Sequence, residues 1–297
     1  MSKILLIGIT GQVGQELQQT LSSIGEVIGV GRQSLDLSQA EQIQQRITQI
    51  KPDVIVNAAA YTAVDKSESE SDLAMTINAT APKAIAVAAQ NIGATVLHIS
   101  TDYVFNGQNH TPYKERDPTD PLGVYGKSKL LGEIGVRENC DRHLILRTAW
   151  VYGSRGHGNF VKTMLRLGSE RTELKVVTDQ IGSPSWSYDI AIAITQLLPK
   201  SWADENINGI YHFTNSGVAS WYDLALATFN EAKQLGFPVK VEQVIPITTA
   251  EFPTPTQRPA YSVLAKTKIT ETLGNYPPYW RDSLRKMLSE WKSISNY

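Results

Sequence analysis

The chain contains a single cysteine, Cys140, among its 297 residues. No disulfide can therefore form within it, which is typical of proteins in a reducing compartment. Lysine and arginine number 28 against 29 aspartates and glutamates, so the basic excess of nucleic-acid-binding proteins is missing. No apolar run approaches the roughly 20 residues that span a membrane, and the apolar start is too short for a signal peptide. We expect a cytoplasmic globular protein without nucleic-acid or membrane partners.

Several catalytic signatures are also missing. The sequence has neither the G-x-S-x-G turn of many hydrolases nor the lysine-containing phosphate loop of nucleoside triphosphatases. Its five histidines show no zinc-ligand spacing such as H-x-x-x-H, so we expect no metal site. Apolar residues nonetheless make up 41% of the chain and charged residues 19%. This composition is sufficient for a sizeable core and excludes a disordered or fibrous protein.

Short apolar segments alternate with segments of helical periodicity through the first half. Residues 4–7 are wholly apolar, as expected for a strand covered on both faces, and Val13 and Leu17 then mark one face of a helix. Ser38 and Glu41 have the spacing of a capping box at the start of the next helix. Further strands are expected at 27–30, 54–56, 96–99 and 144–146. The alternation predicts an α/β fold with a doubly wound parallel sheet of the Rossmann type.

The strand–helix alternation weakens after Trp150, where shorter elements and a turn-rich stretch follow. We therefore expect a dinucleotide-binding domain that carries the catalytic residues over 1–152. A smaller α/β substrate lobe is expected mainly over 153–297, with some of its segments returning to the first domain. Because the chain contains no low-complexity linker, the two parts should pack tightly.

A glycine-rich turn follows the first predicted strand. Its spacing, G-x-x-G-x-x-G, places Gly8, Gly11 and Gly14 between that strand and a helix. The first glycine permits a tight turn, the second lets the backbone approach a pyrophosphate, and the third allows the helix to pack closely. Three glycines can also form a simple turn, but the N–H groups of a helix start are well suited to phosphates. The pattern predicts a dinucleotide site lined by Gly8, Thr10, Gly11, Gln12, Val13 and Gly14.

The end of the second strand indicates which dinucleotide is bound. An acidic residue there binds the ribose 2′-hydroxyl of NAD, but the chain has Gly31 and Arg32. Arg32 is a candidate partner for a 2′-phosphate, the alternative being an ordinary surface arginine. Asp36 and Leu37 are expected to border the adenine, although Asp36 also suits a plain turn. The sequence predicts NADPH as the cofactor, with NADH as an alternative.

Tyr125 and Lys129 lie four positions apart on a predicted helix, so they share one face of it. A tyrosine hydroxyl ordinarily titrates near ~10, and a neighbouring ammonium favours the phenolate and lowers the pKa. Such a tyrosine can donate a proton to a carbonyl oxygen as a hydride arrives. The same spacing also occurs by chance on solvent-exposed helices, so the pair needs supporting residues.

Supporting residues occur at the ends of two predicted strands. Thr101 and Asp102 come just after the strand at 96–99, at the edge where doubly wound sheets bind ligands. Thr101 offers a hydroxyl to a substrate oxygen, the alternative being a helix cap or turn. Residues 57–60, Asn-Ala-Ala-Ala, end the preceding strand with small side chains that leave room for a cofactor.

Together these motifs resemble the extended short-chain dehydrogenase/reductase superfamily, within its nucleotide-sugar branch. The resemblance runs nearly end to end and rests on residues 8–14, 57–60, 63–66, 100–105, 125–129, 146–153, 159–165, 178–180 and 258–259. It implies NAD(P)H-dependent reduction of the 4-keto group of a nucleotide sugar, dTDP-4-dehydro-6-deoxy-L-mannose, to dTDP-L-rhamnose. Such a reaction would serve the synthesis of cell-surface polysaccharide.

The resemblance also implies roles for individual residues. Tyr125 is the expected proton donor, Lys129 its electrostatic partner and Thr101 the third catalytic member. Arg258 is a permanent cation suited to a diphosphate, or alternatively a surface charge. The implied substrate-binding residues are Thr101, Asp102, Phe105, Tyr125, Trp150, Asn159 and Arg258, with Trp221 as a weaker candidate for a sugar contact. The implied cofactor-binding set adds Arg32, Asp36, Leu37, Ala58, Ala59, Ala60, Tyr61, Thr62, Ile99, Tyr125 and Lys129 to the glycine turn.

Two other functions stay open at the level of sequence. One is a nucleotide-sugar epimerase or dehydratase on the same scaffold, which would hold and recycle its cofactor. The other is a non-catalytic regulatory subunit that keeps the fold for binding, against which the retention of Thr101, Tyr125 and Lys129 argues. The sequence is compatible with a monomer or a homodimer.

Overall fold

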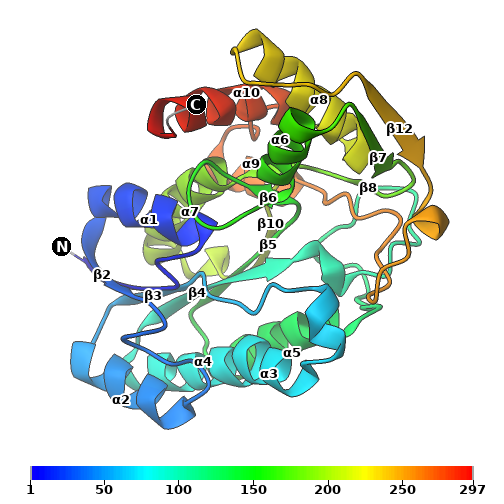
Figure 1. The fold of residues 1–297 in the computed structure, drawn as a ribbon. Coiled ribbons are helices and arrows are strands. Elements are labelled where there is room, and N and C mark those ends of the chain that lie inside the picture. The colour runs from blue at the N-terminus through cyan, green and yellow to red at the C-terminus, as the bar shows by residue number, and fades with distance from the viewer. Residues whose placement is uncertain (1, 296–297) are drawn as a thin grey trace.

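The computed structural model describes residues 2–295, in which a six-stranded parallel sheet has helices on both faces (Figure 1). All of its neighbouring strands run parallel. Across the sheet the strands are β10 (Gly209–His212), β5 (His143–Thr148), β4 (Thr95–Thr101), β3 (Val54–Asn57), β1 (Ser2–Ile7) and β2 (Gly25–Val30). The expected doubly wound Rossmann architecture is confirmed.

Strand β1 shows why the central strands are apolar at every position. Ile4 and Leu6 enter the hydrophobic core on one face of the sheet, and Leu5 and Ile7 enter the core on the other. Successive side chains of a strand point to opposite faces. A strand between two helical layers therefore buries all of them.

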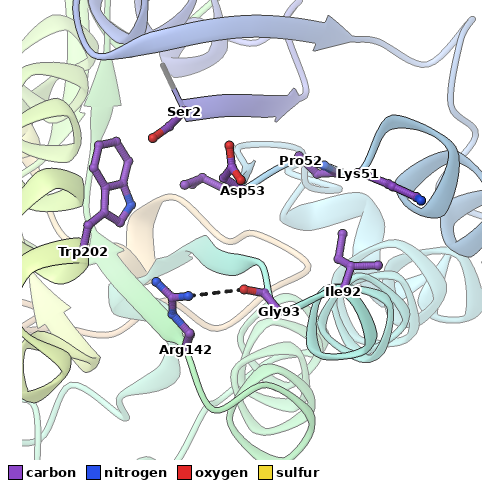
Figure 2. Close-up of a pocket in the computed structure, with 9 residues that line it drawn as sticks. Ser2, Lys51, Pro52, Asp53, Ile92, Gly93, Arg142 and Trp202 are labelled. Carbon is purple, nitrogen blue, oxygen red and sulfur yellow. Dashed lines mark hydrogen bonds between the residues drawn. The ribbon is translucent and has the colours of Figure 1, made fainter.

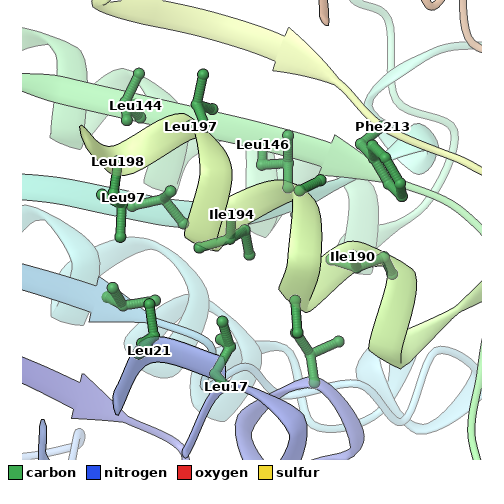
Figure 3. Close-up of a cluster of buried hydrophobic side chains, with 14 of the residues drawn as sticks. Leu17, Leu21, Leu97, Leu144, Leu146, Ile190, Ile194, Leu197, Leu198 and Phe213 are labelled. Carbon is green, nitrogen blue, oxygen red and sulfur yellow. The ribbon is translucent and has the colours of Figure 1, made fainter. Parts of the chain in front are cut away.

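The first of these cores lies between the sheet and helices from distant parts of the chain. Figure 3 shows Leu17 and Leu21 together with Ile190 and Ile194 against side chains of the sheet such as Leu97. Helices α1 (Gln12–Thr20), α7 (Ser187–Ala203) and α9 (Thr267–Leu273) contribute to this core. Helices α2 (Ala40–Ile50), α4 (Ala81–Ile92) and α5 (Val124–Asn139) cover the other face (Figure 1). Helix α3 (Ser71–Met75) continues into α4 through a π-helical turn, Thr76–Thr80.

The start of α2 differs from the expected capping box. The helix begins at Ala40, its N-cap residue is Gln39, and no side chain caps it. The backbone N–H of Ser38 instead donates to Asp36 Oδ1 at 2.9 Å. The turn formed by Asp36 holds Ser38 outside the helix, because an aspartate side chain readily binds the backbone two residues on.

The second half of the chain divides its elements between the sheet and a separate lobe. Strand β10 extends the sheet beside β5, and α7 packs on its face. The lobe holds α6 (Phe160–Glu170), α8 (Trp221–Gln234), α10 (Trp280–Ile294) and the strand pair β7 (Glu173–Val177) and β12 (Gln243–Ile247). Two-residue strands form the pairs β6 (Val151–Tyr152) with β9 (Ser185–Trp186), and β8 (Ile181–Gly182) with β11 (Ala219–Ser220). The expected domain boundary at residue 152 stays a prediction.

Within residues 2–295, no helix is long and apolar enough to cross a membrane.

Candidate active site

The predicted site residues gather where β1, β3 and β4 end. Gly8 follows β1, Ala58 follows β3, and Thr101 is the last residue of β4. These are the carboxyl ends of neighbouring parallel strands, and ligands of doubly wound sheets bind along this edge. The fold therefore brings together motifs that lie about a hundred residues apart in the sequence.

In the glycine turn, backbone atoms of other residues lie so close to Gly8 and Gly14 that a side chain would not fit. Gly8 has a φ of 94°, a conformation that side chains rarely permit. A Cβ on Gly8 would also lie 2.7 Å from the Ala59 nitrogen, and one on Gly14 would collide with the Gly8 carbonyl oxygen. Helix α1 then begins at Gln12 without a side-chain cap, which leaves its first N–H groups for another acceptor. The cradle therefore fits the pyrophosphate of a dinucleotide.

The segment after β2 meets the expectation only in part. Arg32 is exposed beside this turn, whereas Leu37 is buried in the core beneath the sheet. Hydrogen bonds from Ser38 chiefly lower the pKa of Asp36, and Arg32 adds to the effect. Arg32 thus carries an accessible charge, while Leu37 is only 8% exposed.

The segment after β3 begins with three alanines and is held in place by the buried side-chain amide of Asn78. Ala58, Ala59 and Ala60 are partly exposed, as expected of a cofactor wall. Asn78, on the π-helical turn, accepts the backbone N–H of Tyr61 at 2.8 Å and donates to the Tyr61 carbonyl oxygen at 3.0 Å. It also donates to Ser128 Oγ on α5 at 3.0 Å. Thr62 is exposed at the end of the same segment.

Asn78 therefore holds the predicted cofactor wall against the helix that bears Tyr125 and Lys129. Asn78 is not among the site residues predicted from the sequence. Asn78 lies on a π-helical turn, and such turns frequently occur at functional sites. A π-helical turn cannot be predicted from residue spacing.

Thr101 connects the groups around Tyr125. Its hydroxyl donates to Asp102 Oδ1 at 3.1 Å and accepts the Tyr103 N–H at 3.2 Å. Burial raises the pKa of Tyr125 well above its ordinary value, and hydrogen bonding with Thr101 opposes that rise. The expectation that Lys129 lowers this pKa is not met, because burial of the phenol dominates and the opposing group is Thr101. Tyr125 therefore keeps its proton.

Lys129 lies fully inside the protein, one turn after Tyr125 on α5. Its Nζ donates to the Ile99 carbonyl oxygen at 2.6 Å and lies 3.3 Å from His98 Nε2. Burial lowers the pKa of Lys129 to about 8, against the opposite effect of Glu133. Lysine and tyrosine are thus both held close to the end of β4.

Asp102 is buried beside Thr101. Burial raises its pKa to about 6, and its Oδ2 makes no hydrogen bond within the described residues. A buried oxygen without a partner is costly, so this atom is a candidate acceptor for a ligand hydroxyl.

The remaining predicted contacts lie on segments that follow β5. Trp150 lies between β5 and β6, Trp221 is the first residue of α8, and Arg258 lies between β12 and α9. Trp150 stacks on Trp221 with ring centroids 3.6 Å apart and planes 3° apart, and its φ of 47° is unusual for a non-glycine residue. Arg258 pairs with Asp65, with 3.0 Å between Nη2 and Oδ2.

Two predicted substrate residues have other surroundings. Asn159 donates to Gln12 Oε1 at 2.7 Å and caps α6, so it contacts the cofactor turn. Phe105 is 0% exposed, stacks on Tyr113 and receives the Arg147 guanidinium against its ring. Its ring is enclosed by core residues, so direct contact with a substrate is not supported, and we assign it a packing role.

A cavity of about 560 Å³ lies at the opposite end of the sheet (Figure 2). Its wall includes residues at or just before the starts of β1, β3, β4 and β5. It contains none of the residues predicted to bind the cofactor or substrate. Its lining residues are Ser2, Lys51, Pro52, Asp53, Val54, Ile92, Gly93, Arg142 and Trp202. Because ligands of this fold class bind at the carboxyl ends of the strands, we place the active site at the other edge.

Comparison with known proteins gives consistent matches over nearly the whole chain. Residues 2–293 match the family model described as RmlD substrate binding domain. The chain is 44% identical over 291 residues to dTDP-4-dehydrorhamnose reductase of Escherichia coli K12, covering 97% of each protein. A crystal structure of a reductase of that name from Clostridium acetobutylicum has 40% identity and a TM-score of 0.90, covering 98% of this chain and 99% of the other. The Bacillus anthracis reductase, solved in complex with NADP, has 38% identity and a TM-score of 0.90, covering 97% and 99%.

Proposed function

The chain belongs to the RmlD substrate-binding-domain family, and we propose that it reduces the 4-keto group of dTDP-4-dehydrorhamnose with NADPH, producing dTDP-L-rhamnose. The observation that supports this proposal is that Thr101, Tyr125 and Lys129 lie together at the carboxyl end of β4, on the same sheet edge as the glycine turn after β1. The relatives named for this reaction align over nearly their full length. The enzyme is therefore an NADPH-dependent oxidoreductase of nucleotide-sugar synthesis.

The glycine turn and the start of α1 would hold the pyrophosphate of NADPH. Arg32 is the exposed cation beside the predicted adenine end and would pair with the 2′-phosphate. Ala58 to Ala60 leave space along β3. When bound, NADPH supplies the hydride that the keto carbon takes up.

Tyr125 supplies the proton that completes the reduction. As the carbonyl carbon gains the hydride, its oxygen gains negative charge, and the Tyr125 hydroxyl donates its proton to that oxygen. Because burial raises the pKa of Tyr125, the hydroxyl is protonated before the reaction. The positive charge of Lys129 then stabilises the phenolate that remains, and Thr101 holds the phenol and the substrate oxygen in line.

Residues at the end of β4 and in the second half of the chain would orient the sugar nucleotide. The unpartnered Asp102 Oδ2 is placed to accept a sugar hydroxyl. The Trp150–Trp221 stack offers an aromatic surface for the sugar, and Arg258 would exchange Asp65 for the diphosphate, which a guanidinium binds in a bidentate manner.

The proposed reaction is tested by stoichiometry. Purified protein, NADPH and enzymatically prepared dTDP-4-dehydrorhamnose should consume one NADPH for each dTDP-L-rhamnose formed, measured by absorbance and chromatography. A different sugar nucleotide, formed without net NADPH consumption, would indicate an epimerase or dehydratase that recycles its cofactor. Binding of both ligands without product would indicate a regulatory subunit.

A further inference from the structure

His98 is a buried histidine that contacts the catalytic lysine but has no part in the reaction as described. It lies on β4 with no exposed surface. Its Nε2 is 3.3 Å from Lys129 Nζ, and its Nδ1 is 3.1 Å from the Asn57 side-chain nitrogen. The imidazole thus connects the end of β3 to the lysine on α5.

The orientation of Asn57 decides where His98 carries its proton. Asn57 Oδ1 accepts the backbone N–H of Ala59 at 3.2 Å, so the amide NH₂ is the group that faces His98 Nδ1. An NH₂ group only donates, and Nδ1 must therefore be the acceptor. In a neutral imidazole the single hydrogen is then on Nε2, the nitrogen that faces Lys129.

This tautomer presents an N–H group to Lys129 Nζ. An uncharged amine accepts that hydrogen with its lone pair, whereas an ammonium has only donors. We propose, on the basis of the function above, that His98 is a positioning residue for Lys129. Its Nε2–H favours the uncharged amine in the free protein, and it holds the amine against the Ile99 carbonyl oxygen. A further acceptor beside the lysine, such as a ribose hydroxyl of the dinucleotide, would shift this balance toward the ammonium.

The other titratable groups around Lys129 are engaged elsewhere or uncharged. Glu133, one turn later on α5, favours the charged lysine, but its carboxylate accepts hydrogen bonds from Ser100 and Arg147 at 2.6 to 2.8 Å. Tyr125, one turn earlier, keeps its proton. Burial and the nearby Lys129 hold the pKa of His98 well below its ordinary value, so the imidazole is neutral. His98 is thus an uncharged side chain whose Nε2–H faces Lys129 Nζ.

The first test is the pH dependence of kcat/KM for NADPH, which reports groups of the free enzyme. Glutamine in the variant His98→Gln can turn its carbonyl oxygen toward Nζ and so stabilise the ammonium. We expect the alkaline limb of the profile to move upward by about one pH unit. The control is Thr95→Val on the same strand, because the buried Thr95 hydroxyl makes no hydrogen bond within the described residues. An unchanged limb in His98→Gln, or an equal shift in Thr95→Val, would overturn the proposal.

The second test needs neither substrate nor turnover and is valid even if His98→Gln does not fold. Nitrogen NMR of histidine-labelled wild-type protein distinguishes the two neutral tautomers of each of the five histidines. We expect the His98 signal with its hydrogen on Nε2, identified by its contact with the Lys129 Nζ protons. A hydrogen on Nδ1, or a charged imidazole at neutral pH, would contradict the proposal. If the tautomer is as expected but the protein does not reduce the sugar nucleotide, the proposed function alone is wrong.

Discussion

At the scale of single residues, the environment of a side chain decides its chemistry more than its sequence neighbours do. The spacing of Tyr125 and Lys129 correctly indicates that they share a helix face. It says nothing of burial, which raises the pKa of Tyr125 and lowers that of Lys129 to about 8. The hydroxyl of Thr101, from another element, opposes the rise at Tyr125. A tyrosine that keeps its proton suits a reductase, because reduction consumes that proton.

Arg32 provides a prediction about cofactor choice. Replacing it with alanine removes an exposed cation that would bind the 2′-phosphate, and charge-assisted hydrogen bonds contribute about 1.5–3 kcal/mol. We expect KM for NADPH to rise about tenfold or more, while KM for NADH changes little. The control is Lys127→Ala, which removes an exposed charge from α5. Equal losses with both cofactors, or a wild-type preference for NADH, would show that Arg32 does not select NADPH.

At the scale of elements, local patterns predict well where one segment alone sets the geometry. The glycine turn is such a case, since its three glycines meet within one strand–turn–helix unit. The capping box at Ser38 fails because Asp36, outside the pattern, captures the backbone of Ser38. The roles of Phe105, Asn159 and Asn78 depend on partners from distant elements, so their spacing in the sequence carries little information about them.

Gly14→Ala tests the packing of α1 on the cofactor turn. Its new Cβ would collide with the Gly8 carbonyl oxygen, and overpacking of this kind costs about 1–3 kcal/mol. We expect a lower melting temperature and loss of NADPH binding by fluorescence titration. Gly158→Ala is the matched control, because a Cβ there meets no atom within 4 Å. Full NADPH affinity in Gly14→Ala would contradict the assigned close approach.

At the scale of the whole molecule, the alternation of strands and helices predicts the doubly wound sheet because each βα unit repeats the same pattern. The return of α7 and β10 to that sheet is not encoded by any one segment. It follows from the apolar face that α7 presents to the sheet and from the open edge of β5. A sequence shows that such faces exist but not which partner covers them.

Charged residues connect the first and last helices across the molecule. Glu16 on α1 is buried and faces Arg155, with 3.7 Å between Oε2 and Nε, and Arg155 also pairs with Glu290 on α10. Burial, together with the charge of Glu290, raises the pKa of Glu16 to about 7. An acid with a raised pKa in the folded state stabilises the fold at low pH, and this stabilisation is lost as the pH rises through that pKa.

Glu16→Gln removes this pH dependence. At about pH 8 the variant should be more stable than the wild type by about 1–2 kcal/mol, because the buried carboxylate no longer has to be charged. Below about pH 5, where the wild-type carboxyl is protonated, the difference should disappear. Urea unfolding at both pH values measures it, with the exposed Glu170→Gln as the control. Lower stability of Glu16→Gln at the higher pH would mean that the Arg155 ion pair outweighs the cost of burial.

The central claim is that Tyr125 donates the proton during reduction of the sugar, and Tyr125→Phe tests it most directly. Phenylalanine keeps the buried ring and its contact with Tyr103 but has no proton to give. In the NADPH-oxidation assay with dTDP-4-dehydrorhamnose, we predict a fall in kcat of at least ~100-fold, with NADPH binding retained. A kcat close to that of the wild type would contradict the claim.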